Sequence, residues 1–146
     1  MPRIITCRRE HLEAVLELLH DADLPDAGIS HALQSFWVAQ AGAEVVGAVG
    51  LETHGQTALL RSLVVREDRR RGGLGAALVR RVLREAGRLG ANRVVLLTSG
   101  ASEFFRRMGF EPVSLSEVPE AVRVSPGFAT FGEPGAICMR RTLKEP

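Results

Sequence analysis

The chain of 146 residues is 45% hydrophobic and 25% charged, which predicts one compact globular domain spanning 1–146 and excludes a disordered chain. No apolar run reaches the roughly 20 residues of a membrane span, and the N-terminus lacks a signal peptide's apolar core, so we expect a cytoplasmic protein that binds no membrane. The net charge of +2 argues against nucleic-acid binding by charge alone. Two cysteines are too few for a disulfide framework or a tetrahedral metal site.

The first half of the chain predicts a helix followed by a β-meander. Apolar residues recur at helical spacing from Glu10 to His20, and Pro25 and Gly28 interrupt the pattern. Strand-like runs follow, separated by turns short enough to join antiparallel neighbours. We therefore expect strands at 3–8, 36–40, 44–53 and 57–65, and helices at 10–20 and 30–34.

The second half predicts a β–α–β crossover. An apolar stripe indicates a helix over 75–89 that Gly90 ends, and the continuous apolar run at 93–99 is typical of a strand covered on both faces. The fold class is therefore α/β with a mixed sheet. The remaining elements expected are helices at 101–108 and 116–124, strands at 110–114 and 136–143, and a loop at 125–135.

Cys7 and Cys138 both lie in these apolar, strand-like runs. Free thiols are among the most buried side chains in proteins. We expect both to be buried and unpaired.

The most distinctive segment is the basic, glycine-rich loop from Arg66 to Ala76, between a strand and a helix. The first turn of a helix has unpaired N–H groups and partial positive charge, and glycines let a phosphate approach them. The loop lacks the Gly-Lys-Ser/Thr of a Walker loop and the spacing of a Rossmann fingerprint. The pattern predicts a diphosphate site, and it also fits a flexible basic loop that caps a helix.

Two motifs resemble those of the GNAT superfamily of N-acetyltransferases. Arg70-Arg71-Gly72-Gly73-Leu74-Gly75 is similar to its Gln/Arg-x-x-Gly-x-Gly/Ala signature, and 101–110 is similar to its short helix ending in Gly-Phe. The resemblance implies a GNAT fold, acetyl-CoA as co-substrate, no metal, and acetyl transfer to an amine. It implies cofactor contacts at Leu63, Val64, Val65, Arg70, Arg71, Gly72, Gly73, Leu74, Gly75, Ala76 and Phe105.

A closer resemblance runs from end to end, through ITCRREHLEAVLELLHDADLP, GLETHGQTALLRSLVV, LLTSGASEFFRRMGFEPV and FATFGEPGAICM. These segments are similar to small GNAT proteins described as arsenic-resistance N-acetyltransferases. The resemblance implies a small amine acceptor, such as an arsenic- or phosphorus-containing amino acid. It is also compatible with a homodimer.

The catalytic groups are less clearly marked than the loop. Many GNAT enzymes carry a tyrosine acid four residues before Gly-Phe, but Phe105 stands there and the chain contains no tyrosine. Glu52 and His54 are candidates for a general base, and both also fit the surface of a hairpin. Ser62 is a further catalytic candidate, and Arg61 is a candidate for binding the acceptor's acidic group. The other histidines, His11, His20 and His31, are expected on helix surfaces.

Three alternatives follow from the same residues. Because the tyrosine is missing, one alternative is a protein that binds acyl-CoA without turning it over. The motifs equally fit an enzyme that acetylates a protein or a peptide. A nucleic-acid binder would use the arginines of the central helix, namely Arg80, Arg81, Arg84 and Arg88. No aromatic residues accompany these arginines for base stacking.

Overall fold

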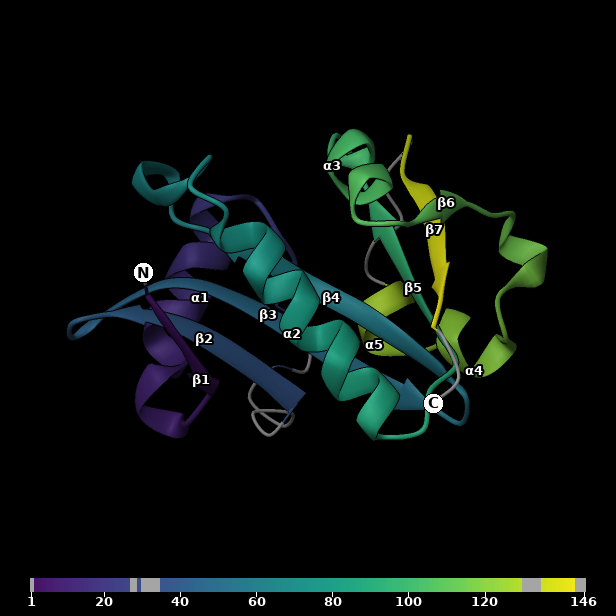
Figure 1. The fold of residues 1–146 in the computed structure, drawn as a ribbon, viewed down its shortest axis with the longest axis horizontal. Coiled ribbons are helices and arrows are strands. Elements are labelled where there is room, and N and C mark those ends of the chain that lie inside the picture. The colour runs from purple at the N-terminus through teal and green to yellow at the C-terminus, as the bar shows by residue number, and fades with distance from the viewer. Residues whose placement is uncertain (1, 27–28, 30–34, 130–134, 144–146) are drawn as a thin grey trace. The chain divides into compact units, whose positions relative to one another are not determined.

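The structure is a computed structural model that describes residues 2–26, 29, 35–129 and 135–143. Seven strands form one mixed sheet in the order β1-β2-β3-β4-β5-β7-β6. They are β1 (Arg3–Thr6), β2 (Phe36–Ala41), β3 (Glu44–His54), β4 (Thr57–Val65), β5 (Arg93–Thr98), β6 (Glu111–Pro112) and β7 (Ile137–Thr142). The helices are α1 (Leu12–Asp21), α2 (Leu74–Arg88), α3 (Ser102–Arg107), α4 (Glu120–Arg123) and α5 (Pro126–Ala129) (Figure 1).

The predicted fold class is confirmed. Strands β1 to β3 pair antiparallel, as do β5, β6 and β7, whereas β4 and β5 pair parallel across the connection through α2. This combination is the mixed sheet with a meander and a β–α–β crossover that the sequence predicts.

The internal contacts of the chain gather into two compact units. The first comprises Met1–Leu51 with Ser62–Val82, and the second comprises Glu52–Arg61 with Leu83–Pro146. The extent of the domain, 1–146, stays a prediction.

The core of the first unit lies between α1 and the strands. Val15, Leu18 and Leu19 of α1 cluster with Phe36 of β2, and Figure 1 shows α1 beside β1 and β2. On β3, a Cβ at Gly47 would lie 3.1 Å from Leu78 Cδ1 and 3.5 Å from Leu74 Cδ2, both on α2. Because neighbouring strand residues point to opposite faces, this glycine lets the start of α2 pack closely on the face opposite α1.

The core of the second unit lies between the sheet and α4 and α5. Val122 and Phe128 of these helices pack with residues of β4, β5 and β7, and Figure 1 shows both helices beside β5 and β7. Both cysteines are free and buried, as predicted. Burial raises the pKa of each thiol to about 11.

Three predictions about local structure are wrong. The loop expected at 125–135 contains α5, because the ring of Phe128 is 7% exposed and anchors this turn in the core despite Gly127. The helix expected at 116–124 is reduced to α4, which follows Pro119, a residue that cannot continue a preceding helix. His11 is buried rather than on a surface, since its Nδ1 accepts the N–H of Arg8 at 2.9 Å.

The helix expected at 30–34 and His31 lie outside the described residues. His20 is exposed as predicted, and its ring lies 2.7 Å from the carboxylate of Asp26.

Candidate functional site

The connection between β4 and α2 presents a row of unpaired backbone amides. The N–H of Arg70 donates to the carbonyl of Glu67, and the N–H of Ala77 donates to the carbonyl of Gly73 at 3.0 Å. Within 35–129, no amide between these two donates to a protein group. Their hydrogen atoms and the positive end of the α2 dipole form a site suited to an anion.

Glycines keep this row of amides open. A Cβ at Gly73 would meet no atom within 4 Å, and at Gly72 the nearest atom, the carbonyl oxygen of Arg69, lies 3.8 Å away. The backbone turns sharply here, with φ of 69° at Arg71 and 86° at Gly73. The left-handed conformation at Gly73 favours glycine, and the non-glycine Arg71 adopts it at some cost in free energy.

Ion pairs hold the start of the loop. Arg66 donates to the carboxylate of Asp68 at 2.7 and 3.1 Å and to that of Glu44. The hydrogen bond from Arg66 lowers the pKa of Asp68, and the hydrogen bonds to the two carboxylates raise the pKa of Arg66. Arg70 adds a link from its Nε to the carbonyl of Val65 at 2.9 Å. The sequence marks Arg66 as the start of the loop but does not predict its pairing with Glu44, which lies 22 residues away on another strand.

The strand before the loop leaves its parallel ladder early. The pairing of β4 with β5 joins Thr57 to Arg93, Ala58 to Val94 and Leu59 to Val95. Ser62 follows with a φ of 58°, which kinks the strand. Leu63 and Val65 are half-buried, and Val64 packs into the core with α1. The cofactor contacts predicted for these three residues stay predictions.

A hollow of about 340 Å³ lies in the first unit, where α1 ends and the loop begins. Its lining carries both carboxylates and guanidinium groups. It consists of Leu18, Asp21, Ala22, Val64, Val65, Arg66, Glu67, Asp68 and Arg70.

A cluster of three charged or titratable side chains lies in the second unit. Arg61 Nη1 lies 3.0 Å from Glu52 Oε2, and the other oxygen of Glu52 lies 3.1 Å from His54 Nε2. The side chains of Arg61, Glu52 and His54 are 6%, 18% and 24% exposed. We call them the Arg61–Glu52–His54 cluster. The sequence suggested each member separately, and the structure brings the three together.

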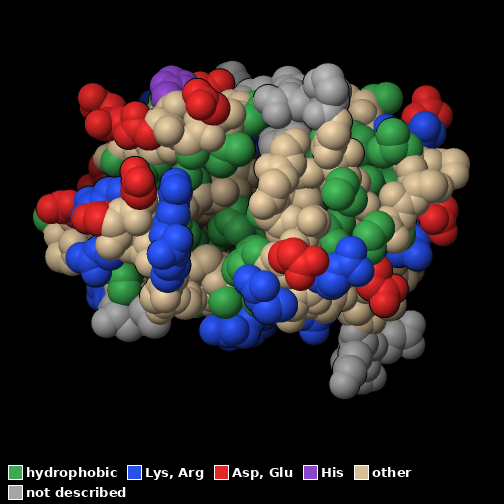
Figure 2. Space-filling view, turned by 90° about the horizontal axis from the view of Figure 1, so that it is seen from above, with side chains coloured by type: hydrophobic (Ala, Val, Ile, Leu, Met, Phe, Trp, Pro, Cys, Tyr) green, Lys and Arg blue, Asp and Glu red, His purple; other side chains and the backbone are tan. Residues whose placement is uncertain are grey.

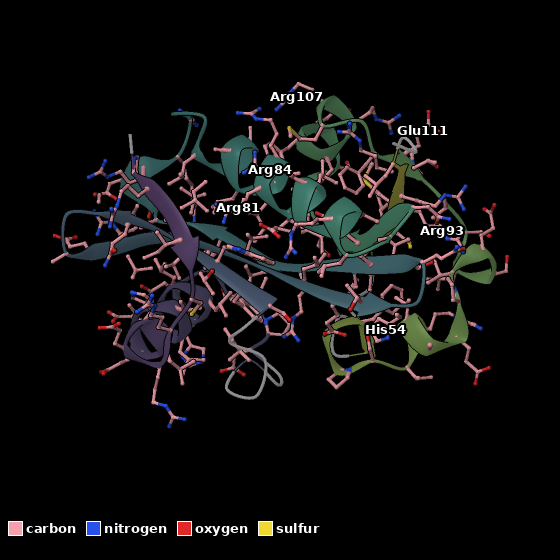
Figure 3. All side chains as sticks on the ribbon, turned by 60° about the horizontal axis from the view of Figure 1, so that its bottom comes forward. His54, Arg81, Arg84, Arg93, Arg107 and Glu111 are labelled. Carbon is pink, nitrogen blue, oxygen red and sulfur yellow. The ribbon has the colours of Figure 1, made fainter. Side chains whose placement is uncertain are left out.

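Helix α5 lies against this cluster. A Cβ on Gly127 would overlap the Oε2 of Glu52 and would lie 2.9 Å from the Cδ of Arg61. Figure 3 shows His54 beside α5. Gly127 was not predicted, because nothing in its sequence context marks a contact with strands 65 or more residues away.

Comparison with known protein families bears on both features. A sequence model of the acetyltransferase (GNAT) domain matches residues 32–112, more than half of the chain. The chain belongs to the GNAT family. The matched range contains the amide row and the Arg61–Glu52–His54 cluster.

Curated relatives of this GNAT chain are acetyltransferases. N-acetyltransferase family 8 member 3 of Rattus norvegicus is 34% identical over 100 residues, which cover 62% of this chain and 44% of the relative. The amino-acid acetyltransferase of Pseudomonas syringae pv. syringae is 37% identical over 62 residues, covering 42% of this chain and 14% of the relative. The chain thus matches less than half the length of either relative.

Solved structures share the GNAT fold. N-acetylglutamate synthase from Neisseria gonorrhoeae, solved with coenzyme A and N-acetyl-glutamate, matches with a TM-score of 0.87. The identity is 19%, and the match covers 99% of this chain and 36% of the synthase. The membership of the arsenic-resistance group stays a prediction.

Phe105 stands where many members of the GNAT family carry a tyrosine, and its ring lies in the core. It is 5% exposed, with edge-to-face contacts to Phe104 and Phe110 at centroid distances of 5.0 and 5.7 Å. A phenyl ring offers no proton. The cofactor contact predicted for Phe105 stays a prediction.

The arginines of α2 do not form a uniform basic face in this GNAT chain. Arg81 is half-buried and donates to the carbonyl of Ile4 at 3.3 Å, and Arg88 pairs with Glu85 at 2.9 Å. Arg80 and Arg84 are exposed. On the molecular face that Figure 2 presents, basic and acidic side chains are interspersed. This arrangement offers no argument for nucleic-acid binding.

Two further findings concern the described residues alone. No helix there is both long enough and apolar enough to cross a bilayer. No three histidine, cysteine or acidic side chains in the same ranges are grouped so that they could hold a metal ion.

Proposed function

We propose that the protein is an acetyl-CoA-dependent N-acetyltransferase that acts on the amine of a small, amino-acid-like molecule. The observation that carries the proposal is the row of unpaired amides at the start of α2, in a chain that belongs to the GNAT family. In this proposal the amides from Arg71 to Ala76 bind the two linked phosphates of coenzyme A. The exposed guanidinium groups of Arg70 and Arg71 add positive charge beside them.

The names of two similar proteins support the proposed substrate class. One relative is an amino-acid acetyltransferase, and one solved structure of the same fold is an N-acetylglutamate synthase. Both names describe an amino acid as the acceptor. We extend this class to arsenic- and phosphorus-containing amino acids, because the chain resembles arsenic-resistance N-acetyltransferases in four segments.

The proposed reaction needs a base that takes a proton from the acceptor's ammonium group. It needs no acidic side chain to protonate the departing thiolate. An ammonium group must lose a proton before its nitrogen can attack the thioester carbonyl, and Glu52, His54 and Ser62 are the candidates to assist. Binding both substrates in the right geometry supplies much of the rate. The cytoplasmic location expected from the sequence stays a prediction, and a homodimer is compatible with the resemblance but untested.

The experiment is a thiol-release assay with purified protein, acetyl-CoA and a panel of acceptors. The panel contains proteinogenic amino acids, arsenic- and phosphorus-containing amino acids, simple amines without an acidic group, and peptides. We expect release with at least one small amino acid and none without an acceptor. Release with peptides alone would favour a protein N-acetyltransferase. Tight coenzyme A binding by calorimetry with no release would favour a sensor.

A further inference from the structure

The Arg61–Glu52–His54 cluster fixes which nitrogen of His54 carries a hydrogen. A carboxylate can only accept hydrogen bonds. Because Oε1 of Glu52 lies 3.1 Å from His54 Nε2, the bond requires the hydrogen on Nε2. The lone pair of a neutral imidazole is then on Nδ1.

The other oxygen of Glu52 is held in place from two sides. Arg61 donates its Nη1–H to Oε2 at 3.0 Å. The backbone of Gly127 on α5 lies so close to Oε2 that a methyl group on Gly127 would overlap this oxygen. The carboxylate therefore has little freedom to rotate away from the histidine.

The burial of Arg61 argues against the substrate-binding role that the sequence suggests. Its side chain is only 6% exposed, and it is committed to Glu52. A guanidinium group in this setting is better placed to hold another protein group than to meet a substrate from solvent.

We propose that His54 accepts the proton of the acceptor amine at Nδ1, and that Arg61 and Gly127 are positioning residues that act through Glu52. The proposal rests on the proposed function, and it reassigns Arg61 from substrate binding to positioning. The substrate's ammonium group transfers one proton to Nδ1 and becomes a neutral amine. The amine nitrogen then bonds to the thioester carbonyl carbon, the carbon–sulfur bond breaks, and the second amine proton ends on the thiol. The proton on His54 leaves to solvent.

The first test is a double-mutant cycle in the thiol-release assay. Glu52→Gln should lower kcat about 100-fold, within the range that general base catalysis contributes. Arg61→Met should lower kcat about 10-fold without changing KM for acetyl-CoA, and Arg61→Lys should recover part of the loss. In the Glu52→Gln background, Arg61→Met should cost no more than about twofold, because residues that act through one group are not additive.

A substrate-binding role for Arg61 gives a different result. Arg61→Met would then raise KM only for acceptors that carry an acidic group, in both backgrounds and with kcat retained. That result overturns the proposal. Arg93→Met is the matched control, since it removes a half-buried arginine of the same unit whose Nε bonds to Thr57 instead.

The second test changes the geometry and leaves every charged group intact. Gly127→Ala adds one methyl group where it must displace the carboxylate of Glu52, and Gly127 has no left-handed φ that alanine would strain. We expect kcat to fall about 10-fold with unchanged affinity for coenzyme A. Gly87→Ala on α2 is the control, because a Cβ there would meet nothing within 4 Å. Equal kcat in Gly127→Ala and wild type overturns the role of Gly127.

The third test does not depend on activity. Nitrogen-15 NMR of histidine-labelled protein reports the tautomer of each ring, and His54→Gln assigns the signal. We expect His54 with its hydrogen on Nε2 in the wild type, and a mixture of tautomers in Arg61→Met and Gly127→Ala. A hydrogen on Nδ1 in the wild type overturns the inference. If the wild type releases no thiol with any amine, the proposed function fails, and the proton-transfer role fails with it, whatever the spectrum shows.

Discussion

The loop before α2 and the Arg61–Glu52–His54 cluster are built by opposite means. The loop at the start of α2 offers main-chain amides of consecutive residues, beside glycines that keep the approach to them open. The Arg61–Glu52–His54 cluster consists of side chains from two strands, covered by a helix, and is mostly buried. This difference shows that a binding site for a common cofactor group can be formed by consecutive residues and recognised in the sequence. A set of interacting side chains depends instead on the register in which strands pair.

The two parts should also differ in how they respond to substitution. The carboxylates of Glu44 and Asp68 beside the loop are exposed, so removing one of their ion pairs with Arg66 should cost little stability. In the cluster, the paired charges of Arg61 and Glu52 are mostly buried, so removing the carboxylate costs stability. The loop should therefore respond mainly in ligand affinity, and the cluster in stability as well as rate.

The largest expected effect is on the loop. Gly75→Asp places a negative charge in the first turn of α2, where it favours the helix but repels a diphosphate. Gly75 has no left-handed φ, so aspartate fits the backbone. We expect the affinity for coenzyme A, measured by calorimetry, to fall at least about 100-fold, or roughly 2.7 kcal/mol.

The control for this substitution carries the same charge elsewhere on the helix. Gly87→Asp lies near the other end of α2, in open space, and should bind coenzyme A as the wild type does. Equal losses in both variants would mean that charge in general, and not the amide row, governs binding.

The next effect concerns the stability of the cluster. Glu52→Leu takes the carboxylate of Glu52 away from the buried guanidinium of Arg61, and we expect the free energy of unfolding to fall by about 3 kcal/mol. Glu44→Gln removes a partner of Arg66 at the exposed loop and should cause no measurable change. Urea denaturation of both variants checks this. A larger loss in Glu44→Gln than in Glu52→Leu would reverse the contrast between the two parts.

The same contrast explains what the sequence could predict. The order of strands and helices follows from periodicity and glycine positions, and the loop follows from Arg70 to Gly75 alone. Glu52, His54 and Arg61 were individual candidates, but their contacts depend on the pairing of β3 with β4. Gly127 and the helix around it were missed, because the burial of Phe128 outweighs the poor helix propensity of glycine.

The smallest expected effect is a pH dependence of the ion pair that holds the loop. Arg66 lowers the pKa of Asp68 in the folded protein, so the pair stabilises the fold at pH values above the ordinary aspartate pKa. This contribution is lost as the pH falls through the lower, folded pKa of Asp68. Asp68→Asn lacks the charge and should lack this dependence. The difference in thermal midpoint between the wild type and Asp68→Asn should therefore be small at about pH 5 and should shrink as the pH falls below the ordinary aspartate pKa. If the difference in thermal midpoint stays constant over this range, Asp68 stabilises the loop through its packing and not through its charge. The loop would then depend on packing, as the cluster does.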